Sequence, residues 1–590
     1  MAGDLERTYS REQQRLGKEL EVPTTPLSLL KKARKYKSTK KTSTPNSISK
    51  RRMNLKKPLR HLNLKRVQDR KFPSGRSSGL MMGILHSRII GAVKPLTQPY
   101  IQQKKLYALC TAILTVMNST ISSSLAAGAT TSISNRFHNT DEYQLILPTS
   151  IFLVGYTCGP LLWGPLSESF GRKWTKIVAF AMFTIFSVAS ALSPNFAAFI
   201  VFRLLTGVGG SAAISIVGGI CADVYHDPRS RGRSMAIFMA ATTFGPIMGP
   251  PISGFSAPVS WSWPFWAGAI FAGASWPVVL CFPETYAPII LKHRAQRLRK
   301  ETGDMSIVAP IELEKTDIRH ILVVVLTRPL RMICFEPLVL FTCLYLSYAY
   351  SIFYIFFQSY PLIFISIYSF NPGEEGLAFL PIGIGAIISA LLYLTWDTIL
   401  ARAQKLGRSW SASEEMRRLP LACIAGPFFV LSLFWAGWTA RVDIHWIVPV
   451  LAGIPFGIGY LCLFMALLNY LVDAYEIFAA SAMAAASFSR SSFGAVLPFA
   501  AKPMYQALGV PWACSLLGFF SLAMCAIPFV FIRFGTVLRR KSRFCQYLAQ
   551  RKREEAEQRE REGRSNANGD ENGEGDVEAA RRRDQGEEKQ

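Results

Sequence analysis

The ionisable side chains that could do chemistry in this sequence lie between or inside long apolar segments. The segment GPLSESFGRK, residues 164–173, joins two apolar stretches and carries Glu168, Arg172 and Lys173. A carboxylate close to a hydrocarbon layer raises the free energy unless a cation or a hydrogen-bond donor is its partner. The chemistry expected of these groups is reversible ion pairing and proton binding, rather than bond cleavage.

Other ionisable side chains lie inside apolar stretches or at their ends. Arg203 has no acidic residue within one helical turn, Glu336 lies early in a second stretch, and Asp473 lies late in a third. A lone arginine in such a place either faces a polar interior or bonds to backbone carbonyl groups. The two carboxylates are candidate proton carriers, with structural pairing of Asp473 to Arg490 as the alternative.

No constellation of residues typical of an enzyme accompanies these groups. The apolar stretches hold no arrangement of His, Asp and Glu typical of catalysis or metal binding, and the 11 cysteines lack CxxC spacing. We therefore expect no catalytic residues, no metal site, no cofactor and no disulfide framework. The ATP-binding pattern GxxxxGK[ST] is also absent, so any transport is expected to be driven by a gradient.

The elements that position these residues are predicted to be membrane helices. Half of the chain is apolar and only 18% is charged, and apolar windows of roughly 20 residues, the length that crosses a bilayer, recur along it. Helices are expected because each segment must satisfy its own backbone hydrogen bonds in lipid. The predicted fold is an all-α membrane protein with twelve transmembrane helices in two six-helix bundles, at 106–127, 144–163, 175–193, 197–221, 234–256, 262–282, 333–357, 376–396, 420–439, 444–471, 478–500 and 512–534.

The longest interruption of the apolar pattern divides these spans six and six. The predicted parts are a basic tail at 1–104, bundles at 105–282 and 333–537, a linker at 283–332, and a charged tail at 538–590. Both tails have the composition of solvated, disordered segments. Attraction of the basic tail to anionic lipid is the alternative, and nucleic-acid binding is not expected of such a chain.

The distribution of Lys and Arg predicts the orientation. The loops after spans 2, 4, 6 and 8 are basic, whereas those after spans 3, 5 and 7 contain no Lys or Arg. By the positive-inside rule the basic loops are cytoplasmic, and so are both termini. The expected location is the plasma membrane, with the vacuolar membrane as the alternative.

Three short segments of the sequence resemble one known family. GPLSESFGRK is similar to the loop between the second and third helices of the major facilitator superfamily, although the family usually has Asp where this chain has Glu168. FRLLTGVGGSAA, at 202–213, resembles the family's arginine-containing fourth helix. GPIMGPPISG, at 245–254, is similar to the Gly-Pro motif of its antiporter branch.

Two longer segments narrow the resemblance. PETYAPIILKHRAQRLRKETGD, at 283–304, and IHWIVPVLAGIPFGIGYLCLFMALLNYLVDAY, at 444–475, are similar to the fungal twelve-span drug:proton antiporters, especially polyamine and multidrug exporters. The resemblance covers about 105–540 and neither tail.

The resemblance implies a conformational latch that joins the two bundles on the cytoplasmic side. Carried over, Arg172 would pair with Asp223, and Glu168 would face the start of span 11 near residue 477. A mere topology signal is the alternative. The implied latch residues are Gly164, Glu168, Gly171, Arg172, Lys173 and Asp223.

The resemblance also assigns roles to spans 4 and 5. Arg203 would lie near the proton pathway, with a structural arginine as the alternative. The span-5 motif would lie at the seam between the halves and seal the bundle against proton leak, with simple packing as the alternative. Its residues are Gly245, Pro246, Gly249, Pro250 and Gly254.

Candidate residues for the substrate path come from polar and aromatic clusters. Aromatic faces of spans 7 and 10 suit flat apolar or cationic ligands, although such residues also serve packing or face lipid. Span 1 carries a cluster of Ser, Thr and Asn. The candidates are Asn118, Ser122, Tyr350, Tyr354, Phe456, Tyr460 and Asn469.

These features predict a secondary active transporter that works by alternating access. The expected activity is proton-coupled antiport that exports small amphipathic or cationic compounds, such as drugs, polyamines or secondary metabolites. Its partners would be substrate, protons and lipid, and the chain is expected to be a monomer. Span 1 lacks the carboxylate of some related exporters, so Glu336 and Asp473 are the expected carriers. A transporter-like receptor or sensor without net transport is the alternative.

Overall fold

The computed structural model describes residues 98–560, apart from short gaps at 226–227, between 304 and 317, at 476–477, at 543 and at scattered positions beyond 551. All regular secondary structure within these residues is helical. Most of the tail 1–104, with its expected lipid contact, and residues 561–590 of the tail 538–590 lie outside the described residues.

The chain divides into two compact units. The main unit comprises Gln102–Ile290 and Thr316–Gln590, and the second comprises Met1–Ile101 with Leu291–Lys315. Most of α11 (Ala287–Thr302), the helix that contains the basic segment 292–300, belongs to the second unit. There Arg299 donates to both carboxylate oxygens of Glu312, at 2.6 and 2.7 Å.

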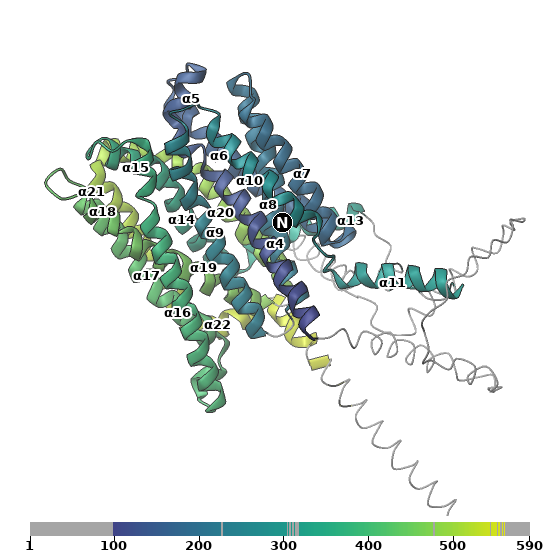
Figure 1. Cartoon of the computed structure of the whole chain (residues 1–590). Coiled ribbons are helices and arrows are strands. Elements are labelled where there is room, and N and C mark those ends of the chain that lie inside the picture. The colour runs from purple at the N-terminus through teal and green to yellow at the C-terminus, as the bar shows by residue number, and fades with distance from the viewer. Residues whose placement is uncertain are drawn as a thin grey trace, which may run out of the picture. The chain divides into compact units, whose positions relative to one another are not determined.

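Six long helices and one short helix form the first half of the main unit (Figure 1). A 3₁₀ turn at Ala127–Ala129 joins the first long helix to the short one. In chain order the helices are α4 (Gln98–Ser124), α5 (Thr130–Phe137), α6 (Glu142–Phe170), α7 (Arg172–Ala191), α8 (Phe196–Val224), α9 (Pro228–Ser256) and α10 (Trp263–Leu280).

The second half begins with a helix that the sequence did not predict. Residues of the expected linker 283–332 form most of α13 (Ile318–Phe335), and Pro337 at the first turn of the next helix separates the two. The following helices are α14 (Pro337–Tyr360), extended by a π-helical turn at Pro361–Ile365, α15 (Pro372–Leu377), α16 (Leu380–Lys405), α17 (Glu414–Thr439), α18 (Ile447–Leu451), α19 (Gly453–Tyr475), α20 (Ala479–Val496), α21 (Pro498–Met524) and α22 (Ala526–Lys541).

The predicted all-α membrane fold is confirmed. The first eleven predicted spans each correspond to one main helix, whereas the last, 512–534, crosses from α21 into α22. Eleven of the described helical segments are long and apolar enough to cross a membrane. α20 is not among them, although it occupies the predicted span 478–500 and carries Arg490. Several helices extend beyond the predicted limits; α6, for example, continues to Phe170, because an apolar window detects only the part that lies in hydrocarbon.

The two halves repeat one packing scheme. In the first half α8 packs against both α6 and α7, and in the second half α19 packs against both α16 and α17. The halves meet along two seams, where α6 contacts α20 and α9 contacts α15, α16 and α19. This arrangement places α6, α9, α14 and α20 around the middle of the main unit (Figure 1).

Candidate functional site

The turn between α6 and α7 places Arg172 at the start of α7. Gly171 has a φ of 93°, which glycine adopts without the steric cost of a Cβ. A Cβ at Gly171 would also lie 2.4 Å from an oxygen of Glu284. Glycine is therefore needed here for both the backbone conformation and the close approach of Glu284.

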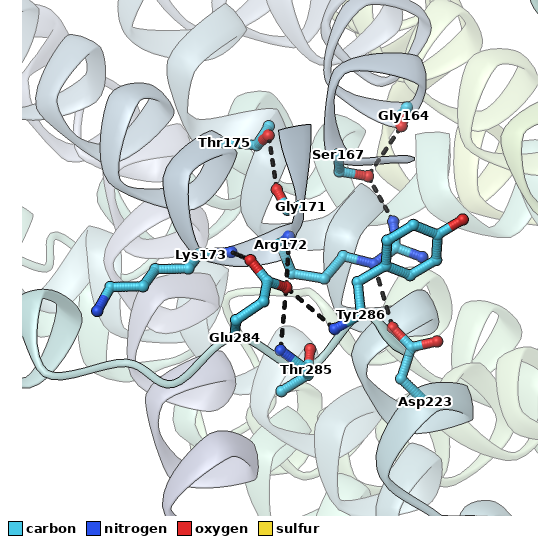
Figure 2. Close-up of polar contacts among 10 residues, drawn as sticks. All are labelled: Gly164, Ser167, Gly171, Arg172, Lys173, Thr175, Asp223, Glu284, Thr285 and Tyr286. Atoms are coloured by element: carbon cyan, nitrogen blue, oxygen red, sulfur yellow. Dashed lines mark hydrogen bonds and ion pairs between the residues drawn. The ribbon is translucent and has the colours of Figure 1, made fainter. Parts of the chain in front are cut away.

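The guanidinium of Arg172 is buried among polar and aromatic partners (Figure 2). Its Nε donates to Asp223 at 3.2 Å, the pairing that the family resemblance implied, and its Nη1 donates to the hydroxyl of Ser167. The ring of Tyr286 lies 4.7 Å from the guanidinium carbon. A Cβ at Gly219 would lie 2.7 Å from Nη2, so a small residue on α8 makes room for the cation.

Glu284 is a partner that sequence reasoning missed. Its carboxylate accepts from the backbone N–H groups of Arg172 and Lys173, at 2.9 and 3.1 Å, and from those of Thr285 and Tyr286, both at 3.0 Å. A carboxylate at a helix N-terminus satisfies N–H groups that have no partner within the helix. The Lys173 side chain points away from this cluster (Figure 2). The sequence signal that could have identified Glu284 is its position, an acidic residue close after the predicted span 262–282.

Glu284→Ala is expected to lower the free energy of unfolding by about 2 kcal/mol or more, because hydrogen bonds to a charged group are lost at the start of α7. Thermal unfolding of the purified full chain in detergent would measure the change. Glu301→Ala removes an exposed carboxylate and serves as the matched control. Equal unfolding temperatures of the two variants would contradict the capping role.

Glu168 links this turn electrostatically to the second half. It is exposed, and its charge interacts with those of Arg172 and Arg328. Arg328 belongs to α13 and lies over the ring of Phe478, 5.5 Å from its centroid, just before α20. The position near 477 that we expected Glu168 to face lies outside the described residues.

Gly164, the first glycine of the GPLSESFGRK segment, lies away from the turn. It is inside α6, and a Cβ there would meet no atom within 4 Å. Of the two glycines in this segment, only Gly171 forms the turn, because α6 continues without interruption to Phe170.

Contacts between the halves occur at both ends of the main unit. At the end that contains the α6–α7 turn, Arg233 of α9 pairs with Asp397 of α16 at 3.0 Å. At the start of α6, Glu142 pairs with Lys502 of α21. Both ends are therefore held by polar contacts between α6 or α9 and the second half.

The Gly-Pro motif of α9 packs on two different neighbours. A Cβ at Gly245 or Gly249 would lie within 2 Å of the hydroxyl oxygen of Thr120 or Ser124, so these glycines face α4. Gly254 instead faces the second half, where a Cβ would lie 2.2 Å from the carbonyl oxygen of Pro372. Pro250 also packs against α15: a Cβ at Gly376 would lie 2.6 Å from its carbonyl carbon.

Gly254→Ala is expected to destabilise the fold by about 1–3 kcal/mol, because an added methyl group must push α9 away from the backbone of α15. The matched control is Gly273→Ala in α10, where a Cβ meets no atom within 4 Å. Thermal unfolding of both variants in detergent would measure the difference. The close packing of α9 on α15 would be contradicted if Gly254→Ala were as stable as Gly273→Ala.

Arg203 is buried in α8 and its donors are used by backbone and hydroxyl acceptors. Nε donates to the carbonyl of Pro148 at 3.1 Å, and Nη2 donates to the carbonyl of Ser122 at 2.9 Å. The ring of Phe152 covers the guanidinium at 4.7 Å. These contacts fit the alternative that Arg203 is a structural arginine. They also place Ser122 beside Arg203.

Glu336 and Asp473 lie at helix ends. Asp473 accepts from Nε of Arg418 at 3.0 Å and is not paired with Arg490, the partner considered from the sequence. Glu336 precedes α14 and accepts from the hydroxyl of Tyr475 at 3.1 Å. Neither carboxylate lines the central cavity.

A central cavity lies between the halves. Its volume of about 20 Å³ admits a water molecule but no drug-sized compound, so substrate binding requires the helices to move apart. It is lined by Thr120, Ile214, Met239, Thr242, Thr243, Pro246, Tyr350, Phe353, Tyr354, Tyr460, Leu461, Phe464 and Arg490.

Only part of the predicted substrate path reaches this cavity. Tyr350, Tyr354 and Tyr460 line it, whereas Phe456 stacks on Tyr460 with ring centroids 5.9 Å apart. The amide of Asn118 donates to the hydroxyl of Ser275 at 2.8 Å and that of Asn469 to its own helix at 2.7 Å. The polar cluster of span 1 therefore contributes Thr120 to the cavity, rather than Asn118 or Ser122.

Two buried charged residues were not predicted for the site. Arg490 of α20 is 6% exposed and lines the cavity. Glu375 of α15 is 4% exposed, and its carboxylate has no ion pair or hydrogen bond within the part of the chain that the structure describes. Local sequence gives no sign that either side chain turns inward.

Comparison with known proteins decides the family. The family model of the Major Facilitator Superfamily matches residues 108–498. The chain belongs to this superfamily. It is therefore an integral, multi-pass membrane protein, and the superfamily's members are transporters.

Several curated proteins that are similar to this chain are fungal transporters. Efflux pump FUB11 of Gibberella fujikuroi is 40% identical over 68% of this chain and 70% of its own length. The citrinin biosynthesis cluster transporter mrr1 of Monascus ruber is 38% identical over 72% and 85%. The multidrug transporter mdrA of Aspergillus fumigatus is 36% identical over 74% and 72%.

A solved structure supports the fold alone. The xylose transporter XylE from E. coli, in a partially occluded inward-open conformation, is 17% identical with a TM-score of 0.51. The match covers 73% of this chain and 98% of XylE.

Proposed function

We propose that this protein exports small amphipathic compounds by proton-coupled antiport and alternating access. The observation that carries the proposal is the small central cavity between the halves, which is lined by aromatic side chains of the second half and by side chains of α4, α8 and α9, with contacts between the halves at both ends. The relatives named as efflux pumps and as a multidrug transporter support export. The described lining contains an arginine and no carboxylate, which favours amphipathic over cationic substrates such as polyamines.

Alternating access would open one end while the other stays closed. Opening of the α6–α7 end would separate Glu168 from Arg328 and Arg233 from Asp397, and these local polar contacts can re-form in water. Opening of the other end would separate α9 from α15 at Gly254. Gly171, Lys173 and the Arg172–Asp223 pair are proposed to act only through the shape of the α6–α7 turn.

Proton coupling requires a group that binds a proton in one state and releases it in another. Glu336 and Asp473 remain candidates for proton binding, and the family resemblance implies a place near the proton pathway for Arg203. Each of these carboxylates already has a partner, since Tyr475 donates to Glu336 and Arg418 pairs with Asp473. Glu375 has none within the described residues, and an isolated buried carboxylate favours its neutral, protonated form. We therefore add Glu375 as the first candidate carrier.

The charge pattern supports the orientation that we propose. The α6–α7 turn is basic and would lie on the cytoplasmic side, together with both termini. We propose a monomer in the plasma membrane, with the vacuolar membrane as the alternative. The basic tail could contact anionic lipid on the same side.

Flux into proteoliposomes tests the proposal. Purified protein should accumulate an amphipathic dye against its gradient when a pH gradient is imposed, and a protonophore should abolish this accumulation. One proton crossing 100 mV supplies about 2.3 kcal/mol. Uphill transport that is unaffected by collapse of both the pH gradient and the membrane potential would overturn antiport. Substrate binding without any flux would favour the receptor alternative.

A further inference from the structure

We propose that the central cavity binds organic anions, and that Arg490 holds the carboxylate of a flat, largely apolar compound. This inference rests on the proposed transport function, because it names the substrate class of the same cavity. It replaces the cationic class that the aromatic residues suggested from the sequence.

Arg490 is a buried cation without a protein counter-charge in the described part of the chain. The side chain is 6% exposed, and its Nε has no hydrogen-bond partner. The rings of Tyr350 and Phe464 lie 5.4 and 5.9 Å from its guanidinium carbon. Ring faces stabilise a cation only partly, and they leave the N–H groups without acceptors.

Other buried arginines of the same fold have acceptors. Arg203 donates to two backbone carbonyl groups, Arg172 donates to Asp223 and Ser167, and Arg418 donates to Asp473 and to the hydroxyl of Tyr393. Arginine is buried here together with oxygen acceptors as a rule. Arg490 is an exception to this rule, and we infer that its acceptor is a bound ligand.

The position of Arg490 fits a ligand group rather than a structural partner. The side chain lines the cavity between the halves, and no described lining residue is acidic. A guanidinium presents two parallel N–H groups that match the two oxygens of a carboxylate. The hydroxyl groups of Tyr350 and Tyr354 lie nearby, 3.4 Å apart, and can donate to the same anion.

The backbone of α20 holds the aromatic wall beside Arg490. Gly494 lies one turn further along, and a Cβ there would lie 2.9 Å from the ring of Tyr350. The ring can therefore pack closely against α20 next to the guanidinium. The site combines a cation for the carboxylate with ring faces for a flat apolar body.

Binding of three probes of one shape tests the proposal. Naphthoate, naphthalenemethanol and naphthylmethylammonium share a ring system and differ in charge. The full chain in detergent should bind naphthoate at least about tenfold more tightly than either other probe, since a desolvated, charge-assisted pair is formed. Arg490→Gln should abolish this preference, and Arg490→Lys should retain part of it. Arg441→Gln, which removes an exposed arginine, should match the unmodified protein.

A second measurement distinguishes a loss of binding from a folding defect of the variant. Naphthoate should raise the unfolding temperature of the unmodified protein and of Arg490→Lys, but not that of Arg490→Gln. Equal binding of the three probes, tighter binding of the cation, or a preference that survives Arg490→Gln would overturn the proposal. Gradient-driven flux of uncharged dyes without any anion preference would overturn this inference and leave the exporter intact. Arg490-dependent binding of naphthoate without flux of any probe would support this inference and overturn the proposed export.

Discussion

Arg172→Ala is expected to reduce substrate flux at least about tenfold while the protein still inserts and accumulates. The substitution removes the cation that pairs with Asp223, whose carboxylate is only 19% exposed, and loss of one partner of a buried pair typically costs about 3–5 kcal/mol. It also removes the side chain that fills the space between Ser167 and Tyr286. The α6–α7 turn should shift, and Glu168 with it, away from Arg328.

Flux per molecule of reconstituted protein measures this effect, with abundance checked in the same membranes. Arg402→Ala removes an exposed arginine from the last turn of α16 and is the matched control. Arg172→Lys should recover part of the flux, because it keeps the charge but not the fork of N–H groups. Normal flux of Arg172→Ala would reduce the GPLSESFGRK segment to a topology signal.

Glu375→Gln is expected to abolish uphill transport driven by a pH gradient while substrate binding persists. The carboxylate is buried near Tyr360 of α14, and it has no cationic partner among the described residues. A protonated carboxyl group can remain in this buried position, whereas the ionised form is stabilised by reaching water when α15 moves away from its neighbours. Glutamine has nearly the same shape but cannot exchange a proton. Substrate binding should therefore no longer be coupled to proton movement.

Proton uptake on addition of substrate, recorded with a pH-sensitive dye in proteoliposomes, measures this coupling. Glu374→Gln changes the adjacent, exposed carboxylate and should behave like the unmodified protein, since its amide oxygen can still accept from the N–H of Asn371. If Glu375→Gln still exchanged protons for substrate, the carrier would lie elsewhere. Glu336→Gln and Asp473→Asn would then be the variants to compare.

The sequence alone determined the membrane fold and the place of the α6–α7 turn. Apolar length is a local property, because each helix satisfies its own backbone hydrogen bonds wherever its neighbours lie. For the same reason the twelve helices could be located without any knowledge of their packing. The ion pair of Arg172 with Asp223 came from the family resemblance, since the two residues are far apart in the chain.

Only the tertiary structure decided which charged side chains meet one another and which face the cavity. Glu284 reaches the start of α7 from a segment more than a hundred residues away, and Arg490 turns into the cavity because α20 packs between α6 and α14. The hydropathy of a helix does not specify which of its faces is buried against which neighbour. Arg490 and Glu375 are buried without an ion-pair partner among the described residues, and this property arises only once distant segments have packed together.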